Sequence, residues 1–418
     1  MNGPERPSAL GSVRDQSGEV TVLGERISQV IARAGVRTPA YVYDLAAVRA
    51  AASALVQALE GRGLCCYAIK ANGAEPIARA IVEAGCGVDV VSGGELKLAL
   101  SAGAAPSTIV YSGVAKRDEE LDLAIGAGIK GIHAESVEEI ERIVARARAL
   151  GRRDVAVGIR INPGVEVDTH AHIATGHDEA KFGVARVDLG RALDHIRGSE
   201  GTLRLVGVSS HVGSMLMAEE PYAEGAAVVA DLARDIRNQG FALEYVDVGG
   251  GFGVPYRDDQ FAADGPAFVR AGRAALDAHG LADLPMVIEP GRALVAAYGI
   301  LVAQVIQPKR SGDRRWLLVD AGMNDLLRPA LYQAHHRIEP LVDDGAARVP
   351  WRVAGPVCES SDDFGTHPLP DPPPPFVVVR EAGAYGRSMA STYNQRPLAP
   401  EVFVDGTVGQ TSVRVVHA

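Results

Sequence analysis

Eight short apolar runs that alternate with longer helical patterns constrain the fold of this chain more than any other feature. The runs end at CCYAIK (65–70), VDVVS (88–92), IVYSG (109–113), GIHAE (131–135), VAVGIRIN (155–162), LVGVSSH (205–211), YVDVGGG (245–251) and MVIEPG (286–291). Between them lie amphipathic stretches such as SVEEIERIVARARALG, which Gly151 ends. Apolar strands that alternate with helices are typical of a parallel sheet covered on its faces. The pattern predicts an α/β fold with a (β/α)8 TIM-type barrel, and an open doubly wound sheet is the alternative architecture.

The pattern changes at residue 292. The later part of the chain has short β-type runs separated by Gly, Pro and Asp: VAQVIQ, RWLLVD, RVPWRVAG, PFVVVREAG and TSVRVVHA. These runs predict a C-terminal, mostly antiparallel β domain over 292–418, after a barrel over 38–291. The N-terminal segment 1–37 is expected to pack with that domain, and AYVYD (40–44) to pair with it. The proline-rich HPLPDPPPP (367–375) is predicted to be a surface loop.

The composition excludes two classes of partner. The chain of 418 residues has a formal net charge of −10, so neither nucleic acid nor an anionic membrane surface would attract it. Its first twenty residues lack the basic and apolar regions of a secretory signal. The four cysteines (65, 66, 86 and 358) show no metal-ligand spacing and are typical of reduced thiols. We therefore expect a cytoplasmic protein without a metal site.

Polar and ionisable side chains follow the predicted strands, at the end where barrels place catalytic groups. They are Lys70, Asp89, Ser112, Glu135, Arg160, Asn162, His211, the glycines 249–251 and Glu289. Lys70 is distinctive because only six of the 42 basic residues are lysines, and lysine, unlike arginine, can form a Schiff base. Taken alone, Lys70 is equally well interpreted as a lysine whose stem covers the end of a strand.

Two loops after the last predicted strands favour phosphate binding. Gly249-Gly250-Gly251 follows the seventh run and Glu289-Pro290-Gly291-Arg292 the eighth, which are the loops that often bind phosphate in barrels. Glycine lets backbone N–H groups approach phosphate oxygens closely. The Glu289 carboxylate, at the end of an apolar strand, needs a cationic partner or a proton. His211, considered alone, is more often an ordinary core histidine.

Together these segments resemble the diaminopimelate decarboxylases, in the fold-type-III group of pyridoxal phosphate enzymes that also holds ornithine decarboxylase and alanine racemase. The resemblance runs from TPAYVYD (38–44) to EAGAYGRSMASTYN (381–394). It rests on YAIKAN (67–72), HVGS (211–214), VDVGGGFGVPY (246–256), EPGR (289–292), VDAGMNDLLRPALY (319–332) and GPVCESSD (355–362). It implies an alanine racemase-like fold in which the barrel binds pyridoxal 5'-phosphate.

The resemblance also implies a role for each matching residue. Lys70 would hold the cofactor as a Schiff base, with the rest of the cofactor site formed by Asp89, His211, Ser214, Gly249, Gly250, Gly251, Glu289, Gly291, Arg292 and Tyr385. The carboxylate at the non-reacting end of the substrate would be bound by Arg292, Arg328 and Tyr332, and Tyr385 would contact both cofactor and substrate. Cys358, as proton donor, and Glu359, which holds the distal amine, would come from the second subunit of a homodimer.

These residue types suit a decarboxylase. A carboxylate at Glu289 would keep the ring nitrogen of the cofactor protonated and so make the cofactor a strong electron sink, whereas racemases of this fold have an arginine there. Arginine matches a substrate carboxylate bidentately. The implied activity is that of a pyridoxal phosphate-dependent carboxy-lyase that converts meso-2,6-diaminopimelate to L-lysine and CO2, the last step of lysine biosynthesis.

Two alternatives remain at this point. A related decarboxylase would act on ornithine, lysine or arginine, but those substrates have no second carboxylate for Arg328. A protein of another class, a non-catalytic pyridoxal phosphate-binding regulator, would be expected to lack the lysine or the proton donor, and Lys70 and Cys358 are both present. The chain departs from the family pattern at Met215, where glutamine is common, and in its short proline-rich segment 367–375.

Overall fold

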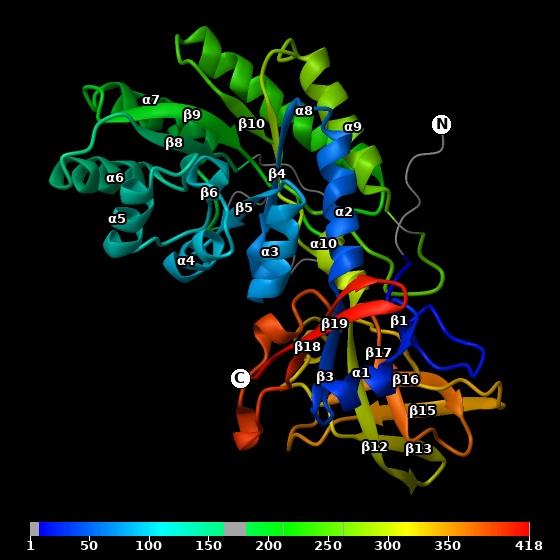
Figure 1. The fold of residues 1–418 in the computed structure, drawn as a ribbon. Coiled ribbons are helices and arrows are strands. Elements are labelled where there is room, and N and C mark those ends of the chain that lie inside the picture. Colours follow the sequence, from blue (N-terminus) through cyan, green and yellow to red (C-terminus); the bar gives the residue numbers. More distant parts are fainter. Residues whose placement is uncertain (1–7, 163–180, 212, 262, 418) are drawn as a thin grey trace. The chain divides into compact units, whose positions relative to one another are not determined.

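The computed structural model describes residues 8–162, 181–211, 213–261 and 263–417, which fall into two compact units (Figure 1). The barrel unit comprises residues 52–253 and 262–291, and the β unit comprises residues 1–51, 254–261 and 292–418. The domain boundaries predicted from the sequence stay predictions, and residues 1–7 of the predicted N-terminal segment lie outside the described residues.

The barrel unit is a closed ring of eight parallel strands in chain order. The strands are β4 (Gly63–Ala68), β5 (Gly87–Val90), β6 (Ile109–Tyr111), β7 (Gly131–Ala134), β8 (Val155–Arg160), β9 (Leu203–Ser209), β10 (Tyr245–Asp247) and β11 (Met286–Ile288). The ring closes where β11 pairs with β4, with Val287 opposite Leu64. The predicted (β/α)8 barrel is confirmed, and the open sheet is excluded.

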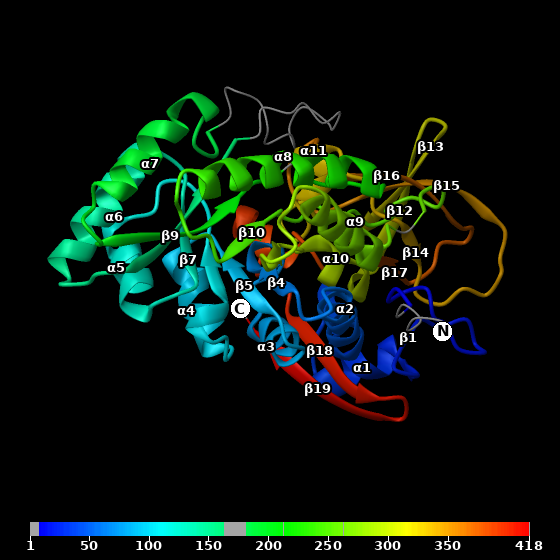
Figure 2. The same ribbon diagram turned by 90° about the horizontal axis from the view of Figure 1, so that it is seen from above.

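Helices connect the barrel strands: α3 (Glu75–Glu83), α4 (Gly93–Ser101), α5 (Asp118–Ala127), α6 (Val137–Ala149), α7 (Leu189–Arg197), α8 (Glu219–Asn238) and α9 (Gly265–Ala278). In Figure 2, α5, α6 and α7 lie outside β7 and β9, and both views show α8 beside α9. Helix α6 shows how the sequence sets these elements. The Ser136 hydroxyl caps its start by accepting from the Glu139 N–H at 3.1 Å, and the left-handed Gly151 (φ 64°) follows its end.

The β unit is built on a nine-stranded, mostly antiparallel sheet. Its main path runs β16 (Asp363–Pro370), β15 (Arg348–Ala354), β13 (Arg314–Val319), β12 (Gly299–Ser311), β3 (Ala40–Asp44), β18 (Glu401–Thr407) and β19 (Gln410–Val416), and β17 (Phe376–Val379) joins β12 to β14 (Ile338–Pro340). The predicted C-terminal β domain is confirmed. Strand β3 is the AYVYD segment, which pairs with β12 and β18 as expected.

The prediction that residues 367–375 form a surface loop is wrong for the first four of them. Residues 367–370 belong to β16, where Pro368 lies opposite Pro350 of β15 and the Leu369 side chain is fully buried. Strand β16 is at the edge of the sheet, so a proline that lacks an N–H group removes no hydrogen bond needed by a further strand. The sequence rule that proline breaks strands holds for central strands and fails here.

The remaining elements of the chain are β1 (Thr21–Val22), β2 (Glu25–Arg26), α1 (Ile27–Ala34), α2 (Leu45–Ala58), α10 (Arg292–Val295) and α11 (Arg328–Tyr332). The core of the β unit contains Val20, Ile27 and Val30 together with Val42 and Ile300 of the sheet. Of the helices in the described part of the chain, none combines the length and the apolar character needed to cross a membrane.

Candidate active site

The polar residues expected at the barrel mouth do stand at the carboxyl ends of its strands. Lys70 lies in the turn after β4, Asp89 is the third residue of β5, and Glu289 follows β11 directly. Ser112 and Glu135 follow β6 and β7, Arg160 ends β8, and His211 comes shortly after β9. The closed ring therefore brings residues that are more than 200 positions apart to one end of the barrel.

The Lys70 amine lies beside a buried carboxylate. Its Nζ atom is 3.5 Å from Oδ2 of Asp89; the Lys70 side chain is 44% exposed, and that of Asp89 is completely buried. Neither carboxylate oxygen of Asp89 accepts a hydrogen bond from a described residue. Gly291 packs closely against the Lys70 turn, because a Cβ there would lie 3.1 Å from Cβ of Ala71. The amine is thus anchored on one side and accessible on the other.

The glycine loop after β10 has no room for side chains. Gly249 and Gly251 have φ values of 69° and 93°, and a Cβ at Gly250 would lie 2.0 Å from the Glu289 carbonyl oxygen. The segment that contains Ser214 runs alongside this loop, because Leu216 N–H donates to the Gly251 carbonyl at 2.9 Å. Because glycine has no side chain, the backbone N–H groups of this loop can approach an anion closely.

A pair of carboxylates lies in the barrel beneath these loops. Asp247 accepts from the Gly249 N–H at 2.9 Å, and Ser112 donates to Glu289 at 3.3 Å. Burial, reinforced by the charge of Asp89, raises the pKa of Glu289 to about 7, and burial beside Glu289 raises the pKa of Asp247 well above its usual range. With His133, the pair offers ligand atoms within 4.8 Å of one another, a spacing that a metal ion could use. When no metal ion is bound, the raised pKa values of Asp247 and Glu289 favour a proton on the pair.

His211 is a neutral imidazole at the same end of the barrel. Burial lowers the pKa of His211 to about 3, and its Nδ1 atom accepts from the Gly250 N–H at 3.4 Å. An uncharged aromatic side chain is suited to stack on a planar ring.

The proton held by the carboxylate pair predicts a pH dependence of stability. The folded state keeps a proton that the unfolded chain releases above a pH of about 4.5, so the free energy of unfolding of the cofactor-free protein falls as pH rises from there to about 7. The slope is at most about 1.4 kcal/mol per pH unit for one proton. Glu289→Gln should flatten it in urea unfolding at pH 5, 6 and 7. Glu119→Gln, at a side chain that is 73% exposed, is the control, and an undiminished slope in Glu289→Gln would contradict the assignment.

In the β unit, two arginine side chains contact the same tyrosine, Tyr256. Arg292 donates to the Tyr256 hydroxyl at 2.9 Å, and the Arg328 guanidinium carbon lies 4.6 Å from the centre of the same ring. Tyr385, with a left-handed φ of 55°, places its ring centre 4.8 Å from the Arg292 guanidinium carbon. Arg328 is buried and forms no ion pair with a carboxylate of the described residues. Buried cations require an anion, so this cluster is a candidate carboxylate site.

The remaining predicted residues of the β unit are more exposed. Tyr332 ends α11, one turn after Arg328, and is 44% exposed. Cys358 is exposed, and its N–H donates to Oδ1 of Asn394 at 2.9 Å. Glu359 accepts from the Tyr393 hydroxyl at 2.5 Å. Tyr393 and Asn394 also line an open hollow of about 720 Å³, together with Met323, Asn324, Leu327, Ser391, Thr392 and Gln395.

Several residues of these clusters were not predicted as site residues, among them Asp247, Tyr256 and His336. Asp247 and Tyr256 lie inside the motif VDVGGGFGVPY (246–256), and this position was a signal that they belong to the site. His336, which contacts Arg328, lies four residues beyond the motif that ends at Tyr332. No pattern in the sequence connects it to Arg328.

Known proteins similar to this chain identify the class of enzyme to which it belongs. Residues 45–296 match the family model of the pyridoxal-dependent decarboxylase, pyridoxal binding domain. A diaminopimelate decarboxylase of Neisseria meningitidis is 38% identical over 88% of this chain and 90% of that protein, and one of Pseudomonas aeruginosa is 38% identical over 94% of this chain and 93% of that protein.

Solved structures agree with this class. Diaminopimelate decarboxylase from Helicobacter pylori, complexed with L-lysine, is 37% identical, with a TM-score of 0.85 over 92% of this chain and 94% of that one. The enzyme from M. jannaschi is 30% identical, with a TM-score of 0.88 over 97% of this chain and 94% of that one. The chain therefore belongs to the diaminopimelate decarboxylase family of pyridoxal phosphate-dependent enzymes.

The described residues fit the cofactor of this family. The glycine loop can take a phosphate, and the Lys70 amine is accessible for attachment. Both oxygens of Asp89 are buried and accept no hydrogen bond from the described residues, and Glu289 can share a proton with a ring nitrogen. These are the groups that a phosphorylated pyridine aldehyde requires.

Proposed function

We propose that this protein decarboxylates meso-2,6-diaminopimelate to L-lysine with pyridoxal phosphate as cofactor. The observation that carries the proposal is the pair Arg292 and Arg328 around Tyr256, which suits a carboxylate that the reaction leaves in place. A pyridoxal phosphate-dependent decarboxylase that binds a second carboxylate acts on an amino diacid. The family relatives act, by their names, on diaminopimelate.

The residues of the barrel unit bind and polarise the cofactor. Lys70 would hold it covalently, and Ser214, the glycine loop and Arg292 would surround its phosphate, with Gly291 beside the Lys70 turn. His211 would stack on the ring, and Glu289 would keep a proton at the ring nitrogen. Asp89, beside the Lys70 amine, would complete this part of the cofactor site. The bound cofactor supplies an electron sink for the carbanion left by the departing CO2.

The residues of the β unit select the substrate. Arg292, Arg328 and Tyr332 bind the carboxylate at the non-reacting end, and Tyr385 contacts substrate and cofactor. Ornithine, lysine and arginine have no carboxylate there, so a buried Arg328 would be left without its anion. This cost disfavours a diamine-forming decarboxylase. A regulator without catalysis is disfavoured because Lys70 and Cys358 are retained.

We also propose a homodimer in which Cys358 and Glu359 act at the partner's site. Cys358 delivers the proton that replaces CO2, and Glu359 pairs with the distal ammonium. Both are exposed, so a second copy can reach them. Cys358 contacts Asn394 and Glu359 contacts Tyr393, two residues that line the hollow. We propose that the dimer acts in the cytoplasm. The net charge of −10 on each chain supports the absence of a nucleic-acid or anionic membrane partner.

The shared site predicts complementation between two inactive variants. Cys358→Ala should lower turnover by about a hundredfold or more, because a positioned proton donor is lost, and should leave cofactor binding intact. Mixed with Lys70→Ala after dissociation and reassociation, it should regain up to about a quarter of wild-type activity, since half of the randomly formed dimers contain one intact site. A mixture that stays inactive although mixed dimers form would contradict the shared site.

Product identification tests the proposed function. The purified protein with pyridoxal phosphate and meso-diaminopimelate should form L-lysine and CO2 in equal amounts, measured by mass spectrometry. Cofactor bound at Lys70 without any lysine formed would contradict the proposal.

A further inference from the structure

Arg328 has a neutral partner inside the β unit. Its Nη1 atom lies 2.7 Å from Nε2 of His336, and its guanidinium lies over the Tyr256 ring. Both Arg328 and His336 are buried, at 6% and 1% exposure. Arginine is normally buried with a carboxylate, so a histidine in that place needs an explanation.

The hydrogen bonds fix the state of His336. A guanidinium N–H can only donate, so Nε2 of His336 must accept, and the ring proton must be on Nδ1. Nδ1 then donates to the Arg380 carbonyl oxygen, which is 2.9 Å away. Burial next to Arg328 lowers the pKa of His336 to about 3, which keeps the ring neutral and Nε2 available as an acceptor near neutral pH.

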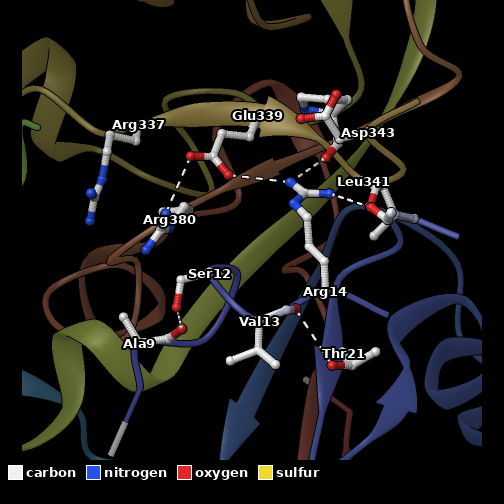
Figure 3. Close-up of polar contacts among 12 residues, drawn as sticks. Ala9, Ser12, Val13, Arg14, Thr21, Arg337, Glu339, Leu341, Asp343 and Arg380 are labelled. Carbon is white, nitrogen blue, oxygen red and sulfur yellow. Dashed lines mark hydrogen bonds and ion pairs between the residues drawn. The ribbon is translucent and has the colours of Figure 1, made fainter. Parts of the chain in front are cut away.

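The Arg380 carbonyl lies directly after β17, in a segment held by several polar contacts. The Arg380 side chain pairs with Glu339 of β14 at 3.2 Å, and Glu339 pairs with Arg14 of the N-terminal segment at 3.2 Å (Figure 3). The Arg380 N–H also donates to the Arg337 carbonyl at 2.9 Å. The position of the imidazole is therefore set by the sheet.

We propose that His336 is a positioning residue that orients Arg328 for the non-reacting carboxylate of the substrate. His336 occupies one N–H of the guanidinium and leaves the others for bidentate binding. Because the imidazole is neutral, it fixes the guanidinium without cancelling its charge, as an aspartate or glutamate in that place would. The inference rests on the proposed function, which gives Arg328 its carboxylate.

Two amide variants separate the two hydrogen bonds of the ring. In His336→Gln, the longer side chain can place its amide oxygen near the position of Nε2 and so accept from Arg328. In His336→Asn, the shorter side chain can donate to the Arg380 carbonyl, as Nδ1 does, but does not reach Arg328. His336→Asn is thus the test variant, and His336→Gln is the matched rescue.

The readout is equilibrium binding to the holoenzyme by calorimetry. L-Lysine carries the carboxylate, and cadaverine is the same diamine without it. His336→Asn should weaken L-lysine binding about ten- to a hundredfold and leave cadaverine binding unchanged, whereas His336→Gln should bind both as the wild type does. In an Arg328→Met background, His336→Asn should have no further effect on L-lysine.

The outcomes separate this inference from the proposed function. Wild-type protein that binds cadaverine as tightly as L-lysine would overturn the carboxylate contact of Arg328 and the inference with it. A wild type that prefers L-lysine, with His336→Asn unchanged, would overturn only the role of His336. If His336→Asn weakened the binding of L-lysine and cadaverine equally, His336 would have a general structural role and the inference would be overturned. The same would follow if His336→Asn and His336→Gln lost L-lysine binding equally.

Discussion

Lys70→Ala is expected to lose essentially all turnover, on the order of a thousandfold or more, because the residue that attaches the cofactor acts as part of one catalytic unit. The Lys70 amine is the accessible nucleophile at the barrel mouth, 3.5 Å from Asp89. The variant should also lose the absorbance band of the lysine-bound cofactor. Unfolding should change little, since the side chain is 44% exposed.

Borohydride reduction gives a direct measurement of the attachment. Reduction of the wild-type holoenzyme should fix the cofactor to Lys70, and peptide mass spectrometry should find the other five lysines unmodified. Lys97→Ala, an exposed lysine of α4, is the matched control and should retain both the label and the activity. Label on another lysine, or a Lys70→Ala protein with substantial turnover, would remove Lys70 from this role.

Arg328→Met is expected to raise KM for meso-diaminopimelate on the order of a hundredfold, with a smaller effect on kcat. Removal of one partner of a buried charge pair leaves the substrate carboxylate without its cation, and a contact made equally in ground and transition states appears in KM. We propose that Arg328, buried over Tyr256, contacts the substrate and not the cofactor, so the effect should appear in substrate binding.

Steady-state kinetics of Arg328→Met and of a control variant distinguish loss of the substrate contact from a general effect of removing an arginine. Arg352→Met removes an arginine that is already paired, at 2.7 Å, with Asp363, so its KM should stay near that of the wild type. Cofactor affinity should be unchanged in both variants. An Arg328→Met enzyme with wild-type KM would contradict the carboxylate site.

The sequence predicted the barrel and its mouth because both depend on local patterns. Alternating apolar runs define the strands, and the residue that follows each strand is at the mouth once the ring closes, as Lys70 and Glu289 are. The edge position of β16 was not predictable, because it depends on which strands pair. Met215, a departure from the family pattern, adopts a left-handed φ of 65° beside Ser214, a conformation that depends on the surrounding loops.

The arginine cluster was only partly predictable. The sequence motifs include Arg292 and Arg328. Tyr256, which contacts both in the structure, lies 36 positions before Arg292 and 72 before Arg328 in the sequence. His336 is recognisable only through the 2.7 Å contact with Arg328 and the anchoring carbonyl of Arg380. Such contacts between distant positions follow from the packing of the sheet, for which a single sequence has no local signal.

The most direct test of the proposed activity compares kcat/KM for CO2 release from meso-diaminopimelate, ornithine, lysine and arginine with one preparation of holoenzyme. The account predicts release from diaminopimelate, with values for the other three lower by at least about a hundredfold, because they bring no carboxylate to Arg328. Release from ornithine, lysine or arginine at a comparable kcat/KM would contradict it.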